Sequence, residues 1–141
     1  MYFEYKIKYS RQTGEENPKK QTESYLVDGV NCAAVEKRVF EEIQPYIFGD
    51  HEILHCKKAS YYDIFPHEGD DYWYRARVEL TTIDGEKEIR RIVTVLVQAN
   101  TVDDAVSALK QAMKSSDMEI ITIARSPIVD VFRILCHYNL T

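Results

Sequence analysis

Phe3-Glu4-Tyr5-Lys6-Ile7-Lys8-Tyr9, near the start of the chain, alternates apolar and charged residues. An alternation with period two predicts a strand with one buried face. The same alternation returns in Tyr74-Arg75-Ala76-Arg77-Val78-Glu79-Leu80, where Tyr74 stands 71 positions after Phe3. Two matching strands so far apart in the chain predict an internal repeat.

Three further pairs of segments extend this repeat. Residues 25–29 match residues 95–99, residues 52–54 match 119–121, and Asp63-Ile64-Phe65 matches Asp130-Val131-Phe132. The offset between the matched segments shortens from 71 to 67 positions along the chain. Such slippage places insertions and deletions in loops, as a duplication would.

Helix signals follow the second strand in both halves. In the second half Thr101 is the expected N-cap of a helix with apolar residues at spacings of three and four. In the first half Asn31 is the expected N-cap, and the apolar positions that recur every fourth residue are Val35, Val39, Ile43 and Ile47. Pro45 favours an end to this helix nearby, because proline disfavours helical backbone in the residue before it.

Each half therefore reads as strand, strand, helix, strand, followed by a short turn at Asp-Ile-Phe or Asp-Val-Phe. A hairpin followed by a returning helix predicts antiparallel sheets of strand order 2-1-3, with the helix on one face. The predicted repeats cover residues 1–65 and 72–132, joined by residues 66–71, and residues 133–141 are expected to pack as a last strand. Since a half of this length buries little surface, we expect one pseudo-twofold α+β domain, residues 1–141, made by tandem duplication.

Composition limits the class of protein. The 141 residues include 18 Lys and Arg against 23 Asp and Glu, which gives a net charge of −5, and 45% of the residues are hydrophobic. These values exclude a disordered chain, and no apolar run approaches the roughly 20 residues of a membrane-spanning helix. The first residues lack the basic and apolar order of a signal peptide. We therefore expect a cytoplasmic protein with no membrane partner.

The cysteines point to the same compartment. Cys32, Cys56 and Cys136 are odd in number and widely spaced. This spacing indicates neither a disulfide framework nor a thiolate zinc site. We expect buried, reduced thiols.

Several strand and turn segments are similar to those of a known family. The segments are residues 1–9, Tyr25-Leu26-Val27-Asp28-Gly29, Ile64-Phe65-Pro66, Trp73-Tyr74-Arg75, Leu96-Val97-Gln98-Ala99 and Asp130-Val131-Phe132. Together they resemble the family called domain of unknown function 4494, and the resemblance runs over almost the whole chain. It implies a small cytoplasmic protein of Bacteroidetes or of the viruses that infect them, and it brings no catalytic residues.

One segment matches a zinc-protease motif. His51-Glu52-Ile53-Leu54-His55 fits His-Glu-x-x-His, which holds zinc when the two imidazoles share one helix face. The repeat instead lays this segment over residues 118–122, a run typical of a strand. In a strand the two histidines would lie roughly 13 Å apart, too far to share one ion. We therefore expect no metal here.

Other patterns associated with catalysis are weak. The connector residues His67, Glu68, Asp70 and Asp71 lack the oxygen spacing of a calcium loop. The sequence contains no P-loop, Gly-x-Gly-x-x-Gly or Gly-x-Ser-x-Gly motif. Cys56 and His55, as neighbours in a strand, would point to opposite faces. The sequence therefore predicts no catalytic residue, no cofactor and no metal, and a protein that is not an enzyme.

Basic residues occupy outward positions on the matched strands, and these residues are Lys6, Lys8, Arg75 and Arg77. Flanked by Trp73, they could follow a phosphate backbone while the indole stacks on a base. Alternatively, they are the solvated side of an antiparallel sheet, and the negative net charge disfavours general affinity for nucleic acid.

Aromatic residues suggest a second kind of partner. The chain has ten tyrosines; those at inward strand positions, Tyr5, Tyr9 and Tyr74, are expected in the core. Partly exposed Tyr, Trp and Arg are typical of protein interfaces. Our first prediction is a non-enzymatic interaction module that binds a protein partner or a second copy of itself, in a phage or mobile-element setting. The alternative is a nucleic-acid-binding protein that uses Lys6, Lys8, Trp73, Arg75 and Arg77.

Overall fold

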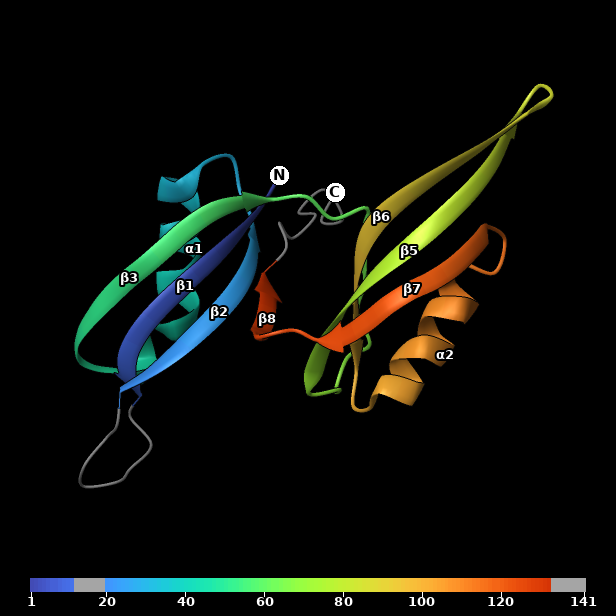
Figure 1. Ribbon diagram of the computed structural model, residues 1–141. Coiled ribbons are helices and arrows are strands. Elements are labelled where there is room, and N and C mark those ends of the chain that lie inside the picture. Colours follow the sequence, from blue (N-terminus) through green and yellow to red (C-terminus); the bar gives the residue numbers. More distant parts are fainter. Residues whose placement is uncertain (12–19, 133–141) are drawn as a thin grey trace, which may run out of the picture. The chain divides into compact units, whose positions relative to one another are not determined.

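The computed structural model describes residues 1–11 and 20–132 (Figure 1). The chain forms two compact units, of which unit 1 holds residues 1–59 and the segment from Ile128 onward, and unit 2 holds residues 60–127. Each unit has one α-helix and a four-stranded, mostly antiparallel sheet, which confirms the α+β class. Among the described residues, no helix is long and apolar enough to span a membrane. The tail predicted at 133–141 lies outside the described residues.

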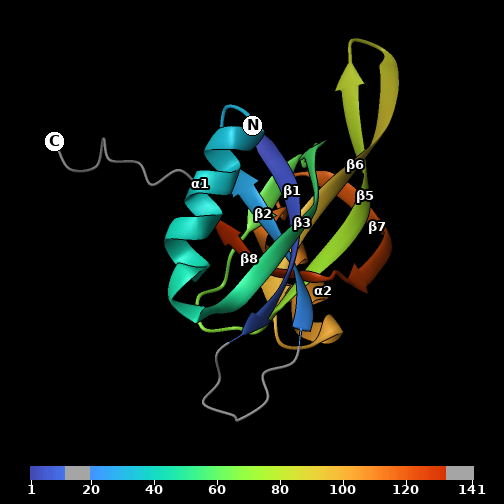
Figure 2. The same ribbon diagram turned by 90° about the vertical axis from the view of Figure 1, so that its left-hand side faces the viewer.

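Unit 1 has the strand order β3-β1-β2-β8. Its elements are β1 (Tyr2–Arg11), β2 (Lys20–Asp28), α1 (Cys32–Ile43), the short 3-10 helix η1 (Gln44–Tyr46), β3 (Ile47–Ala59) and β8 (Ile128–Phe132). Helix α1 lies against one face of the sheet (Figures 1 and 2). The first three strands confirm the predicted order 2-1-3.

Unit 2 has the strand order β4-β6-β5-β7, which again confirms 2-1-3 for its first three long strands. Its elements are β4 (Asp63–Phe65), β5 (Tyr72–Asp84), β6 (Lys87–Ala99), α2 (Val102–Ala112) and β7 (Asp117–Arg125). The β5–β6 hairpin continues past the end of β7 (Figure 1). At its tip Gly85 has φ +65°, a conformation that glycine adopts without strain.

The alternating residues form the two cores as predicted. In unit 1 the buried residues of α1, namely Val35, Val39 and Ile43, pack on the inward side chains of β1 and β2. In unit 2 Leu109 of α2 and Met113, the C-cap of that helix, pack on those of β5 and β6. Apolar burial on one face of each sheet therefore holds each helix in place.

The helix ends follow the sequence signals with one exception. Asn31 accepts a hydrogen bond from the amide of Ala34 at 2.9 Å, and Thr101 accepts one from the amide of Asp104 at 3.1 Å, so both predicted N-caps are confirmed. Helix α1 ends at Ile43, close to Pro45. Ile47, predicted as the next apolar position of this helix, is instead the first residue of β3. The period of four continues by chance beyond the break at proline.

The two segments predicted as short turns are strands instead. Asp63-Ile64-Phe65 forms β4, which pairs in parallel with β6, and residues 128–132 form β8, which pairs in parallel with β2. Each sheet is thus completed by the segment that follows the third strand of the other half, so neither sheet is purely antiparallel. Otherwise the outer edges of β2 and β6 would present unpaired backbone groups.

Cys32 and Cys56 form a disulfide, with Cα atoms 6.1 Å apart. The expectation of reduced thiols is wrong for this pair. The packing of α1 beside β3 brings together two residues that stand 24 positions apart. These cysteines therefore give no support to a reducing compartment.

Removing this disulfide by Cys56→Ser is expected to lower the free energy of unfolding of unit 1 by about 3 kcal/mol. The disulfide closes a loop of 24 residues, and a crosslink of that span restricts the unfolded chain. Urea denaturation with and without a reductant measures the effect. Reductant should destabilise the original chain and leave the variant unchanged; equal stability of the original chain under both conditions would contradict the prediction.

Candidate functional site

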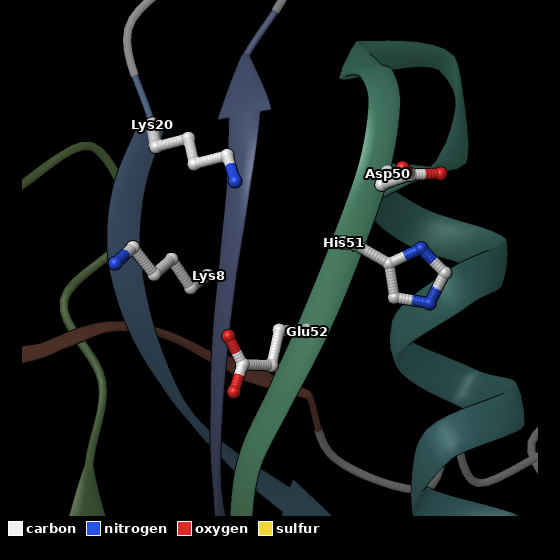
Figure 3. A pocket seen from close by; sticks show the side chains of 5 residues that line it. All are labelled: Lys8, Lys20, Asp50, His51 and Glu52. Carbon is white, nitrogen blue, oxygen red and sulfur yellow. The ribbon is translucent and has the colours of Figure 1, made fainter.

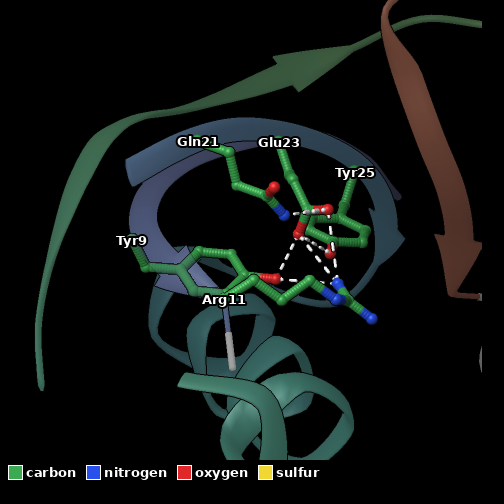
Figure 4. Close-up of polar contacts among 5 residues, drawn as sticks. All are labelled: Tyr9, Arg11, Gln21, Glu23 and Tyr25. Atoms are coloured by element: carbon green, nitrogen blue, oxygen red, sulfur yellow. Dashed lines mark hydrogen bonds and ion pairs between the residues drawn. The ribbon is translucent and has the colours of Figure 1, made fainter. Parts of the chain in front are cut away.

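A carboxylate lies in the core of unit 1. Glu23 of β2 is only 9% exposed and stands on the sheet face that packs against α1. Tyr9 donates a short hydrogen bond to its Oε1, and Tyr25 donates another at 2.7 Å. Gln21 donates to Oε2 at 3.1 Å, and Arg11 forms an ion pair with the same oxygen at 3.3 Å (Figure 4). We call these five residues the Glu23 cluster.

The environment of the cluster keeps its tyrosines protonated. Burial raises the pKa of Tyr9 and of Tyr25, and the adjacent Glu23 carboxylate raises both further. The positive charge of Arg11 acts on the pKa of Tyr9 in the opposite direction and is outweighed. Both hydroxyls therefore keep their protons at neutral pH and donate them to Glu23, so neither acts as a phenolate nucleophile.

Unit 2 builds the corresponding part of its core without charge. Counted along the paired strands, Glu23 and Tyr9 of unit 1 correspond to Val93 and Leu80 of unit 2. Both residues belong to the apolar packing of unit 2. Well-packed apolar residues are often as stabilising as a buried ion pair, so this fold does not require the charged cluster. The cluster is therefore our candidate functional site.

A pocket of about 270 Å³ opens beside the cluster. Arg11 and Tyr25 line it, and its other walls are Glu42, Ile43, Tyr46, Val129, Asp130 and Phe132. The Arg11 guanidinium lies 4.4 Å from the centre of the Tyr46 ring, and the rings of Tyr25 and Phe132 stack with centroids 5.1 Å apart. The pocket therefore combines one cation with two carboxylates and an aromatic wall.

The two carboxylates of the pocket differ in their partners. Glu42 forms an ion pair with Arg38 at 2.8 Å, one turn away on α1. Asp130 accepts a hydrogen bond from the amide of Val131 at 2.8 Å. Burial and then the charge of Glu42 raise the pKa of Asp130, against the effect of that hydrogen bond. A cation placed near Asp130 would therefore be attracted by two neighbouring carboxylates, those of Asp130 and Glu42.

The sequence pattern does not single out Glu23, Arg11 or Asp130. A signal is nevertheless present, because residues 23, 25 and 27 alternate inward in β2 and Glu23 is the charged one among them. Tyr5, Tyr9 and Tyr74, predicted as core residues, are indeed buried. The hydrogen bond from Tyr9 to Glu23 depends on which residues are neighbours in space, and the periodicity of the sequence does not reveal this.

The basic residues of unit 1 lie on the sheet face away from α1, because the residues between them in β1 pack against that helix. Lys8 is exposed and Lys6 half-buried. Lys8 lines a second pocket, of about 220 Å³, together with Lys20, Asp50, His51 and Glu52 (Figure 3). Two of these five residues are acidic, so the surface around Lys8 carries both signs of charge.

The other predicted nucleic-acid contacts belong to unit 2. Arg77 is exposed, and Arg75 is half-buried and donates from Nε to the hydroxyl of Tyr61 at 3.0 Å. Trp73 is only 4% exposed, and its carbonyl accepts a hydrogen bond from the amide of Ser126 at 2.8 Å. An indole so buried does not present a face on which a base could stack.

The zinc-protease motif lies in β3, as the repeat predicts. His51 stands beside Tyr9 and His55 beside Lys6, so the two imidazoles face opposite sides of the sheet. The ring of His51 turns toward α1 and packs edge-on against Phe40, with centroids 4.7 Å apart (Figure 3). Over the described ranges 1–11 and 20–132, no group of three or more His, Cys, Asp or Glu side chains could hold a metal ion.

Comparison with known proteins identifies a family. The family described as Domain of unknown function (DUF4494) matches residues 1–134. No curated protein and no solved structure matches the chain. The geometry of the two units is therefore the main source for a functional proposal.

Proposed function

The chain belongs to the DUF4494 family, and from this premise we propose that it is a non-enzymatic interaction module that binds a protein partner along β3 or β7. Both strands end their sheets, so within residues 1–11 and 20–132 their outer edges carry backbone N–H and C=O groups without a neighbouring strand of the same sheet. They span 13 and 9 residues, whereas the opposite edges, β8 and β4, span 5 and 3. A strand of a partner can add to such an edge.

Matching bulges carry this proposal. In β3 the register shifts opposite Lys6 and Ile7, so Leu54 has no partner residue on β1. In β7 the register shifts opposite Arg77 and Val78, so Ile121 has no partner residue on β5. Leu54 is 42% exposed and Ile121 44% exposed.

A bulge redirects a side chain and limits the length over which a regular strand can pair. An exposed aliphatic residue at the same point of both edges therefore favours a selected partner strand over indiscriminate pairing. The same match supports our inference that the two units descend from a tandem duplication, because this bulge and the strand order correspond, although β3 has a second register shift, between Tyr9 and Ser10, that β7 lacks.

Replacing Leu54 or Ile121 by Asp tests the proposal. Both side chains are exposed, so the free energy of unfolding should change by no more than about 0.5 kcal/mol. The experiment captures proteins from a lysate of the source cells and then titrates any retained protein, purified, against each variant. We expect about tenfold weaker binding to at least one variant, as for an apolar contact at the centre of an interface.

Ile83→Asp is the matched control, because Ile83 lies near the tip of the β5–β6 hairpin and is 79% exposed. It should bind like the original chain. Equal binding by all three variants would exclude the edge strands as the interface. The alternative function would instead be supported if the chain retained nucleic acid and this binding weakened steeply with salt. The double variant Lys6→Glu/Lys8→Glu should then abolish the binding.

A further inference from the structure

The pocket beside the Glu23 cluster has opposite charges at its two ends. At one end Tyr9 and Glu23 hold Arg11, and every one of these hydrogen bonds uses its Nη1. Another nitrogen of the guanidinium points away from the cluster (Figure 4). Because a guanidinium carries five N–H donors in one plane, a held Arg11 still has donors for an anionic group.

The other end is acidic. Asp130 and Glu42 both line the pocket, and each carries a negative charge near the other. Arg38 already forms an ion pair with Glu42. An ammonium group placed at Asp130 would add a second cation, besides Arg38, beside these two carboxylates.

The two charged ends belong to the same pocket. Arg11 contacts Glu23, and Asp130 stands beside Tyr25, two residues further along β2. Arg11 belongs to β1 and Asp130 to β8, which lie on opposite sides of β2. Both residues line the one pocket, so a small molecule inside it can contact both ends. The rings of Tyr46 and Phe132 line the same pocket and offer apolar surface to a side chain.

We propose that this pocket binds a small zwitterion of the α-amino acid class, with its carboxylate at Arg11 and its ammonium group at Asp130. The site is separate from the strand edges of the proposed function, so either proposal can fail without the other. The volume of about 270 Å³ limits the ligand to roughly one amino acid.

The site is tested by titrating the full chain with three probes, and binding is measured by amide NMR shifts and by calorimetry. L-phenylalanine carries both charges and an aromatic side chain, phenethylamine lacks the carboxylate, and 3-phenylpropionate lacks the ammonium group. We expect saturable binding of L-phenylalanine, with shifts at Tyr25, Tyr46 and Asp130, and binding at least about tenfold weaker for each of the other probes.

Asp130→Asn should weaken the binding of L-phenylalanine by about tenfold, because the amide no longer attracts an ammonium group. Asp63→Asn is the matched control: Asp63 accepts a hydrogen bond from the amide of the next residue at 2.8 Å, as Asp130 does, but lies in β4 of unit 2. Absence of saturable binding to the original chain at about 10 mM would overturn the proposal. So would equal binding of phenethylamine, or an equal loss in both variants.

Discussion

Unit 1 is expected to lose stability steeply above pH 10, by up to about 4 kcal/mol per pH unit, because it contains three buried tyrosines with raised pKa values. Burial raises the pKa of Tyr5 from 10.0 to about 12, and the charge of Glu36 adds to the effect. Burial together with Glu23 also raises the pKa of Tyr9 and of Tyr25.

The sign follows from proton uptake. Above pH 10 the unfolded chain releases these protons while the folded unit keeps them, so folding binds protons and weakens as the pH rises. The stabilisation is complete below pH 10 and is lost as the pH passes through the folded pKa values. Each tyrosine contributes about 1.4 kcal/mol per pH unit. Urea denaturation followed by circular dichroism from neutral to alkaline pH measures the slope, in a Cys136→Ser background that prevents thiol exchange.

Tyr5→Phe separates one tyrosine from the others. The hydroxyl of Tyr5 is buried and has no hydrogen-bond partner among the described residues, so its removal should cost no stability at neutral pH. The alkaline slope should fall by about a third, since one of three tyrosines no longer titrates. Tyr62→Phe serves as control because Tyr62 is 50% exposed. A slope that is the same in Tyr5→Phe as in the original chain would contradict the explanation.

Glu23→Ala is expected to destabilise unit 1 by about 3–5 kcal/mol. The substitution leaves the charge of Arg11 and the hydroxyls of Tyr9 and Tyr25 without their common acceptor. Urea denaturation at neutral pH measures the change. The unfolding of unit 2 should be unaffected if the two transitions separate.

A second variant tests whether the fold needs the cluster. Tyr9→Leu, Arg11→Thr and Glu23→Val together install the residues that unit 2 has at the same ladder positions. We expect this triple variant to recover most of the stability that Glu23→Ala loses, because uncharged residues replace both charged members, Arg11 and Glu23, together. A loss below about 1 kcal/mol in Glu23→Ala, or a triple variant as unstable as the single one, would show that the cluster has a different role.

Local patterns in the sequence predict most of the fold. The alternation in residues 3–9 and 74–80 locates β1 and β5, since side-chain direction in a strand depends only on position. Asn31 and Thr101 locate the starts of both helices, because capping acts within one turn. These features are short-range, and a single sequence contains them in full.

Long-range contacts account for what the sequence does not predict. Strand β4 has three residues, too few to show a period, and its pairing with β6 depends on a segment about 30 positions away. The disulfide needs the packing of α1 beside β3. The pocket beside the Glu23 cluster has the same origin, because Asp130 lies beside Tyr25 through the pairing of β8 with β2.

The positions of β4 and β8 also decide what a shortened form of this protein would contain. A chain that stopped at residue 65 would retain β4, which pairs with β6, and would lack β8, which pairs with β2. The remaining part of the chain would retain β8 and would lack β4, the partner of β6. Each fragment would then carry the piece that completes the other, so a useful boundary for truncation follows the sheets and not the halves of the sequence.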